Sequence, residues 1–142
     1  MGKRKNASTV IKPPEEIDRI QSIDKNNIFD ENYPLFCFKY LSDISISNCR
    51  DHKFFVDFLC RLQKLSSLGW NEIRKSSRHS FGMEPIPVSR IRQQLPTCVT
   101  PDVQMLHVFR ACGDNRPFIG LQVGRIFRVF FIEAKFGDIY NH

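Results

Sequence analysis

The stretch that decides the fold is Met105–Ala134, MLHVFRACGDNRPFIGLQVGRIFRVFFIEA. It contains three short runs rich in aromatic and β-branched residues, separated by turn residues at 113–117 and at Gly124. The runs cover residues 105–112, 118–123 and 125–134. Runs of this composition bounded by turns are typical of an antiparallel meander. The third run is the most apolar, which predicts a central strand buried on both faces.

Upstream of the meander, the spacing of apolar residues predicts two helices. Asp51 is a good N-cap for a helix that runs to about Ser67. Its apolar stripe follows the helical repeat, and its members are Phe54, Phe55, Phe58, Leu59, Leu62 and Leu65. Gly69 ends this helix, and a second, shorter one is predicted from Trp70 to Lys75.

The remaining elements complete an α+β order. Residues 35–40 read as an aromatic-rich strand, 42–48 as a turn region, and 86–88 as a short strand. The sequence therefore predicts two helices packed on one face of a mainly antiparallel four- to five-stranded sheet. Residues 35–142 form this single α+β domain. Residues 1–34 are predicted to be a basic and polar N-terminal extension, partly flexible.

Composition narrows the class of protein. The chain has 142 residues, of which 42% are apolar and 25% charged, so we expect one globular domain. The longest apolar runs are far too short to span a membrane, and no signal peptide opens the sequence, so we expect a cytoplasmic protein without membrane contact. The five cysteines are widely spaced, which predicts reduced thiols that are mostly buried, with Cys37 in a strand and Cys60 on the apolar side of a helix. We expect no metal site and no cofactor.

Positive charge is concentrated in the C-terminal half. Between residues 74 and 128 there are nine basic residues and three acidic ones. Eight of the nine are arginine, whose planar fork suits phosphate and base edges. This favours a polyanionic partner, with RNA first, although the same charge could serve only to solubilise the surface. The predicted nucleic-acid contacts are Arg74, Lys75, Arg78, Arg116 and Arg125.

The C-terminal segment offers candidate catalytic groups. Asp138, Tyr140 and His142 occupy alternate positions, so an extended backbone would place them on one face. A carboxylate, a phenol and an imidazole beside basic residues suit cleavage of RNA without a metal, in which a base deprotonates a 2′-OH and an acid protonates the leaving oxygen. The alternative is a polar, frayed terminus with Tyr140 packed back on the sheet.

The chain resembles the RelE/HigB superfamily of toxin ribonucleases over roughly residues 35–142. The order of strand, two helices and meander is similar, as is the close of the chain, where Phe136 precedes the Asp, Tyr and His cluster. The segments WNEI at 70–73 and RHSFGME at 78–84 are similar to phage and mobile-element proteins associated with that superfamily. The resemblance implies a RelE-like fold, mRNA cleavage, often on the ribosome, and an antitoxin partner. It also implies that His79 is the functional histidine that precedes the meander, although a histidine in a loop could equally cap a helix or be merely exposed.

The leading hypothesis is therefore a metal-independent endoribonuclease toxin of a toxin–antitoxin or phage-defence system. Arg110 and Arg128 would neutralise phosphate charge, and His79 and His142 would exchange protons. The structural alternative for Arg128 is an ion pair with Glu133, Asp138 or Glu84. Asp138 would orient a histidine, and Tyr140 would position a base. The rival hypotheses are a non-catalytic phage or mobile-element module that binds nucleic acid or protein, and an interaction protein that acts through its N-terminal tail.

Overall fold

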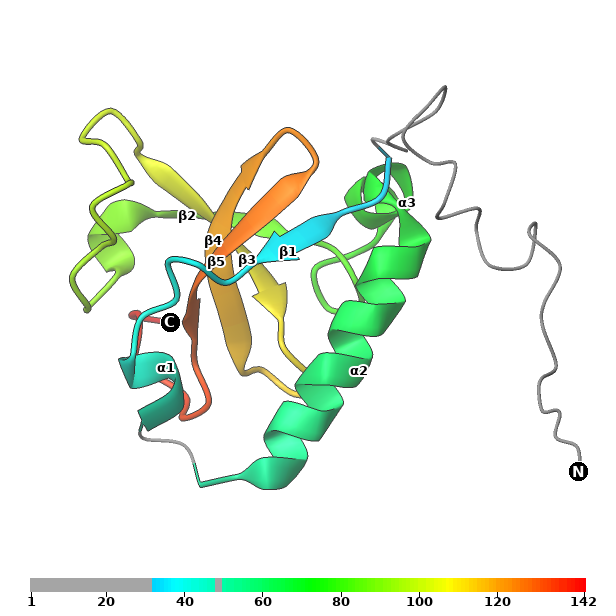
Figure 1. The fold of residues 1–142 in the computed structure, drawn as a ribbon, viewed down its shortest axis with the longest axis horizontal. Coiled ribbons are helices and arrows are strands. Elements are labelled where there is room, and N and C mark those ends of the chain that lie inside the picture. The colour runs from blue at the N-terminus through cyan, green and yellow to red at the C-terminus, as the bar shows by residue number, and fades with distance from the viewer. Residues whose placement is uncertain (1–31, 48–49) are drawn as a thin grey trace, which may run out of the picture. The chain divides into compact units, whose positions relative to one another are not determined.

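A five-stranded mixed sheet forms the centre of the structure (Figure 1). The computed structural model describes residues 32–47 and 50–142. Its strands are β1 (Leu35–Cys37), β2 (Glu84–Pro87), β3 (Met105–Arg110), β4 (Pro117–Val123) and β5 (Ile126–Ile132). They lie in the order β1-β5-β4-β3-β2, with β1 parallel to β5 and the other neighbours antiparallel. The predicted α+β class and the meander are confirmed, whereas the parallel pair makes the sheet mixed.

The two predicted helices form at the expected positions. Helix α2 (His52–Leu68) follows Asp51, whose side chain accepts a hydrogen bond of 3.0 Å from the Phe54 amide. Helix α2 ends at Gly69, which has a φ of 84° that residues with a Cβ rarely adopt. Helix α3 (Trp70–Lys75) follows directly. The N-cap residue Asp51 and the helix-ending Gly69 are therefore sufficient to locate both helices.

An aromatic core fills the space between these helices and the sheet. Phe118 of β4 and Phe127 of β5 are fully buried beneath α2 and α3, and both contact Phe109 of β3 with ring centroids 5.0 Å apart. Phe58 of α2 packs edge-on against Phe118, also at 5.0 Å. This cluster fixes the orientation of β3, at whose end Arg110 lies.

The opposite face of the sheet is covered by shorter segments, as Figure 1 shows. Helix α1 (Ile44–Ser47) lies there, and Ser45 accepts a hydrogen bond of 2.9 Å from the Ile132 amide. A 3₁₀ turn (Val88–Arg90) and the C-terminal residues Ile139 and Tyr140 pack on the same core. The prediction of two helices on one face is therefore incomplete. The region 42–48 was interpreted as a turn, yet it contains a third helix on the other face.

Strand β2 forms one edge of the sheet and has the sequence Glu-Pro-Ile-Pro. It pairs with β3 on one side only, with Ile86 opposite Leu106. Pro85 and Pro87 have no backbone N–H, a composition that suits an edge strand.

The described part of the chain belongs to one compact unit, and it includes residues on the N-terminal side of the predicted boundary. Asn32 accepts hydrogen bonds from the amides of Trp70 and Asn71 at the start of α3, the second at 3.0 Å. The rest of the predicted extension, residues 1–31, lies outside the described residues. Within residues 32–47 and 50–142, no helix is both long and apolar enough to cross a bilayer.

The cysteine prediction needs one correction. Cys37, Cys60, Cys98 and Cys112 are all free thiols. Cys112 is buried, but Cys60 is exposed, because it lies on the outer side of α2 next to the exposed Leu59. The apolar stripe predicted for α2 is therefore too wide, because Leu59 and Cys60 are exposed and only part of the stripe faces the core.

Candidate functional site

A pocket of about 200 Å³ brings together residues from several separate elements of the fold. Four of the six predicted catalytic residues line it, namely His79, Arg110, Tyr140 and His142. The other lining residues are Arg78, Glu84, Val108, Phe109, Asn115, Pro117 and Phe136. The loop after α3, the ends of β2 and β3, the turn between β3 and β4 and the C-terminal segment all contribute. We call this space the Arg110 pocket.

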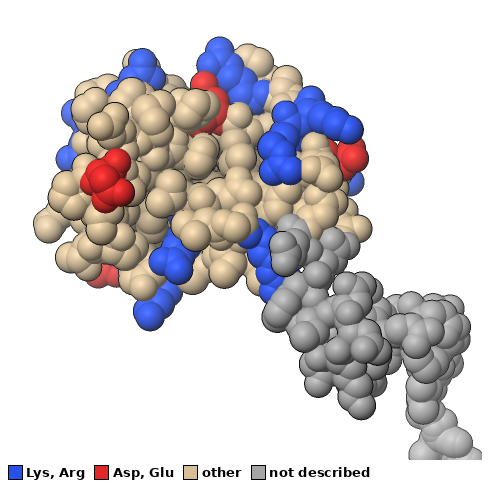
Figure 2. Space-filling view, turned by 90° about the horizontal axis from the view of Figure 1, so that it is seen from above, with Lys and Arg blue, Asp and Glu red and all other residues tan. Residues whose placement is uncertain are grey.

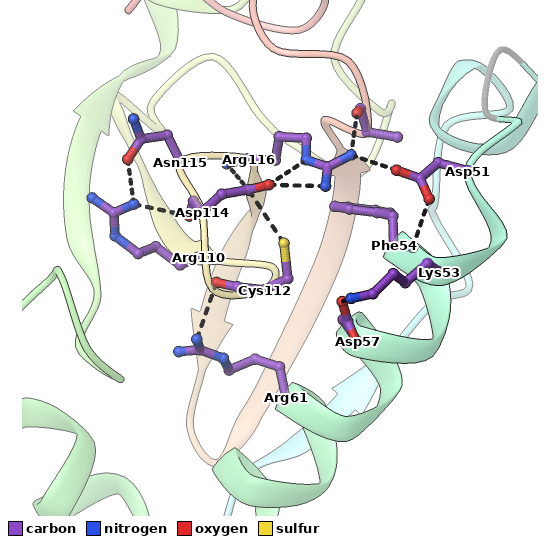
Figure 3. A network of polar contacts seen from close by, with 11 residues as sticks. Asp51, Lys53, Phe54, Asp57, Arg61, Arg110, Cys112, Asp114, Asn115 and Arg116 are labelled. Atoms are coloured by element: carbon purple, nitrogen blue, oxygen red, sulfur yellow. Dashed lines mark hydrogen bonds and ion pairs between the residues drawn. The ribbon is translucent and has the colours of Figure 1, made fainter.

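The guanidinium of Arg110 is held entirely by neutral acceptors. Its Nε donates to the Arg78 carbonyl at 3.1 Å, and its Nη1 donates to the Asp114 carbonyl at 2.9 Å and to the Asn115 side chain at 2.6 Å. Figure 3 shows the last two contacts. Its Nη2 lies 2.8 Å from His79 Nδ1. Four of its five N–H groups are thereby used. The side chain is fixed in place, yet no carboxylate of the described residues pairs with its charge.

Arg116, on the same turn, has the opposite environment (Figure 3). It forms ion pairs with Asp114 at 2.8 Å and with Asp51 at 3.1 Å, and it lies over the Phe54 ring. Hydrogen bonding to Asp114 is the main cause that raises the pKa of Arg116. Its charge is neutralised within the fold, and the side chain joins the β3–β4 turn to the start of α2. The prediction that Arg116 contacts nucleic acid is therefore unsupported, because it serves as a structural ion pair.

His79 acts as a hydrogen-bond partner of Arg110. A guanidinium can only donate, so His79 Nδ1 accepts from Arg110, and Arg78 Nε lies 3.4 Å from His79 Nε2 on the other side of the ring. Arg78, the preceding residue, forms an ion pair of 2.8 Å with Glu84 of β2. Glu84 thus offsets Arg78 at the rim of the pocket and leaves Arg110 uncompensated.

The partner of His142 is Glu133, to which the sequence analysis assigns no role at the site. Glu133 is fully buried at the end of β5. One carboxylate oxygen accepts from the amides of Ile139 and Tyr140 at 2.8 and 3.1 Å, and the other contacts His142 Nε2. The His142 ring lies between Phe136 and Tyr140, with centroids 3.7 and 3.9 Å away. Glu133 therefore engages His142 through Nε2, and His142 Nδ1 forms no hydrogen bond with the described residues.

Tyr140 packs back onto the sheet and is only 6% exposed. Burial is the main cause that raises the pKa of its hydroxyl to about 12, and the negative charges of Glu133 and Glu84 add to it. The phenol therefore keeps its proton at neutral pH, and Tyr140 forms part of the pocket wall. A covered ring cannot stack on a nucleotide base, so the predicted base-positioning role does not suit Tyr140.

Backbone hydrogen bonds hold the C-terminal segment against residues 90–92. Tyr140 forms an antiparallel bridge with Ile91. The Arg92 amide donates to the Ile139 carbonyl at 2.6 Å, and the Asn141 amide donates to the Arg90 carbonyl at 3.1 Å. The segment 90–92 therefore determines where the C-terminal residues of the pocket lie.

Two predicted catalytic residues lie outside the Arg110 pocket. Asp138 lines a different depression, of about 510 Å³, next to Ser45 and Ile132. The predicted common face of Asp138, Tyr140 and His142 is absent, because residues 136–139 turn and do not extend. The guanidinium of Arg128 lies 5.6 Å from the Tyr40 ring centroid, which explains how an arginine is accommodated in a central strand.

The remaining predicted nucleic-acid contacts are also dispersed. Arg74 and Lys75 are exposed at the end of α3, where Arg74 donates to Asn71 at 2.6 Å. Arg125 lies in the β4–β5 turn, and its carbonyl accepts from the Trp70 indole at 3.0 Å. On the face drawn in Figure 2, lysine and arginine side chains form several separate groups with apolar or neutral surface between them. On that face the basic side chains therefore do not join into one continuous patch.

The comparisons with known proteins add no assignment. No protein family, curated protein or solved structure matches the chain. Among the described residues, no three His, Cys, Asp or Glu side chains are grouped so that they could hold a metal ion. The interpretation of the site therefore depends on its own geometry.

Proposed function

We propose that the Arg110 pocket cleaves RNA by metal-independent transesterification. The observation that carries the proposal is that a fixed, uncompensated guanidinium shares one small pocket with two histidines. Cleavage next to a 2′-OH requires positive charge at the phosphate and two groups that transfer protons. Arg110, His79 and His142 supply these three groups.

The reaction we propose begins when a phosphate displaces His79 from Arg110. The Nη2 N–H turns to a phosphate oxygen, which frees the lone pair on His79 Nδ1. That nitrogen takes the proton from the ribose 2′-OH, and the 2′-oxygen forms a bond to phosphorus. The bond from phosphorus to the 5′-oxygen breaks, and protonated His142 donates its Nδ1 proton to that oxygen. The products are a 2′,3′-cyclic phosphate and a 5′-hydroxyl.

Glu133 and Tyr140 support this step. Glu133 orients His142 and pairs with its protonated form. The Tyr140 hydroxyl, which retains its proton, donates a hydrogen bond to the phosphate as negative charge develops. In this proposal Glu133 takes the orienting role that the sequence analysis gave to Asp138, and Arg110 acts on the phosphate without Arg128.

The proposed setting is a toxin that cuts mRNA in the cytoplasm, either free or on the ribosome, and that an antitoxin protein restrains. The first test is induced expression in bacteria, because it supplies ribosomes as well as mRNA. We expect growth arrest and new mRNA cuts. Variants Arg110→Gln and His142→Gln should lower cleavage by on the order of 100-fold. His142→Gln is preferable to truncation of Tyr140, since Tyr140 is part of the core.

The matched control is Arg74→Gln, which removes an equal charge from an exposed residue on α3. It should arrest growth like the intact chain. A second test uses purified protein with EDTA and an RNA that carries one 2′-deoxyribose at the cut site, which should block that cut alone. If well-expressed protein causes no arrest and cuts no RNA, the ribonuclease is refuted and a binding module remains. Equal activity of the Arg110→Gln variant would refute the assigned site.

A further inference from the structure

Two arginines outside every predicted contact set flank the C-terminal segment. Arg90 and Arg92 lie on either side of Ile91, which bridges to Tyr140. The Arg92 guanidinium donates to the Gly137 carbonyl at 2.8 Å, next to Phe136 of the pocket. The two arginines therefore line the segment that carries the pocket residues Phe136, Tyr140 and His142. We call residues 90–92 and 136–142 together the C-terminal ridge.

The charges of this ridge are as uncompensated as that of Arg110. Both arginines are exposed, and neither forms an ion pair within residues 32–47 and 50–142. The acceptor of Arg92 is a neutral carbonyl. The Arg90 carbonyl accepts a hydrogen bond of 3.1 Å from the Asn141 amide, so Arg90 lies next to the segment that joins Tyr140 and His142. Three arginines without an ion pair, Arg110 at the pocket and Arg90 and Arg92 on the ridge, therefore lie along one path, which also carries Asp138.

An exposed aromatic ring lies on the same ridge. Phe136 is 51% exposed, which is high for a phenylalanine in a chain whose other phenylalanines mostly form the core. One face of the ring stacks on His142 at 3.7 Å, so the exposed area lies on the side away from the pocket histidine. A ring held in place on one face and open to solvent on the other is suited to stack with a flat ligand.

We infer that the C-terminal ridge is a binding track for the nucleotides next to the one held in the Arg110 pocket. The base beside the reacting phosphate stacks on Phe136, and the following phosphates contact Arg92 and Arg90. Aromatic stacking combined with backbone charge is how proteins hold single strands without reading their sequence. The ligand is thus a single-stranded RNA several nucleotides long. This inference builds on the proposed function, because it extends the same site.

The exposed cations of helix α3 make a poorer track. Arg74 and Lys75 lie on the opposite side of the sheet from the C-terminal ridge (Figure 1). Each of the two surfaces carries one carboxylate, Glu72 on α3 and Asp138 on the ridge, but no exposed aromatic residue belongs to α3, whose Trp70 is buried. A strand bound in the Arg110 pocket would therefore pass over the ridge and not over α3.

The test measures binding and not cleavage. The probes are fluorescently labelled oligouridylates of eight and two residues, with a 2′-O-methyl group on every ribose so that no 2′-OH can react. Binding is followed by anisotropy between 50 and 200 mM salt. The double variant Arg90→Gln with Arg92→Gln should lower the slope of log affinity against log salt by about 1.4, since each phosphate contact on a single strand contributes about 0.7. Affinity for the two-residue probe should stay unchanged.

Matched control variants test whether binding depends on the position of the ridge arginines or only on the total positive charge of the protein. The double variant Arg74→Gln with Lys75→Gln removes the same charge and should leave the slope unchanged. Phe136→Leu should weaken binding of the eight-residue probe at least about fivefold through loss of one stacked base, and Phe136→Trp should restore it. Because Arg92 also holds Gly137, the single variant Arg90→Gln is measured as well and should lower the slope by about 0.7.

The outcomes distinguish this inference from the proposed function. Equal slopes for the ridge and α3 variants, or an unchanged Phe136→Leu affinity, would refute the track even if the intact protein cuts RNA. A slope change confined to the ridge variants would support the track even if no RNA is cut, in which case the catalytic proposal fails alone. Absence of binding to either probe would overturn the track, since these oligonucleotides have the backbone it is inferred to hold.

Discussion

Replacement of Glu133 tests both how the C-terminal segment is held and how His142 works. The buried carboxylate accepts hydrogen bonds from two backbone amides and contacts the imidazole of His142. Glu133→Ala would leave the two amides without acceptors, and each buried donor left unpaired costs about 1–3 kcal/mol. With the cavity left by the side chain, the expected loss in unfolding free energy is about 4 kcal/mol. For a domain of this size that corresponds to a fall in Tm of about 15 °C.

Glu133→Gln should separate stability from activity. Its carbonyl oxygen can keep both bonds to the Ile139 and Tyr140 amides, so the loss in unfolding free energy should stay near 1 kcal/mol. Its NH₂ group then donates towards His142 Nε2, so this nitrogen must accept and stay unprotonated. The imidazole therefore cannot carry a proton on both ring nitrogens, as the proposed acid requires. Cleavage should fall on the order of 100-fold.

The assay combines urea unfolding followed by the fluorescence of Trp70, which is buried, with cleavage rates on the same protein samples. A loss below about 1 kcal/mol for Glu133→Ala would show that the anchoring argument is wrong. Full cleavage activity in Glu133→Gln, at unchanged stability, would refute the role given to the Glu133–His142 pair.

Three further predictions concern stability alone. Burial lowers the pKa of His107, so the folded state resists protonation of this ring and the free energy of unfolding should fall as pH drops below the ordinary value of 6.5. In His107→Leu, the urea concentration at the unfolding midpoint should change less between pH 5 and 7.5 than in the intact chain. Partial burial raises the pKa of Asp114, but hydrogen bonds from Arg116 outweigh it and lower that pKa to about 2, so this pair stabilises above about pH 4 and the contribution is lost as pH falls towards 2. Because Asp114 is half exposed, Asp114→Asn should remove no more than about 1 kcal/mol of that acid-sensitive stability, read from acid titrations. Gly120→Ala should lower Tm by several degrees in a thermal melt, because a Cβ there would overlap the Arg128 carbonyl oxygen across the β4–β5 pair; an unchanged Tm would contradict this.

The elements predicted well were those with signals close together in the sequence. Asp51 and Gly69 bound α2 by local rules of capping and conformation, and the structure agrees with them. The parallel pairing of Leu35 with Ile126 joins residues far apart in the chain, which periodicity cannot reveal. Helix α1 has only four residues, too few for a helical repeat to be recognised.

The functional site shows the same difference between local signals and contacts of residues far apart in the chain. The sequence supplied His79, Arg110, Tyr140 and His142 as separate candidates, but not the contact between His79 and Arg110, since that depends on how the loop after α3 meets β3. Glu133 received no role at the site in the sequence analysis, because its contacts with the Ile139 and Tyr140 amides and with His142 depend on how the C-terminal segment folds back. Its one available signal was that of a carboxylate within the apolar run 125–134, which is predicted as a central strand. A buried charge at such a position needs partners.

The prolines of strand β2 affect how copies of this chain meet. An edge strand normally offers N–H and carbonyl groups to which a strand of another molecule can add. Two of the four residues of β2 lack the N–H, and the strand at the other edge, β1, has only three residues. Neither edge can support a long intermolecular ladder. Replacing Pro85 and Pro87 with threonine should therefore increase concentration-dependent aggregation while the pocket stays intact, because the substitutions would complete a hydrogen-bonding edge that the natural sequence leaves interrupted.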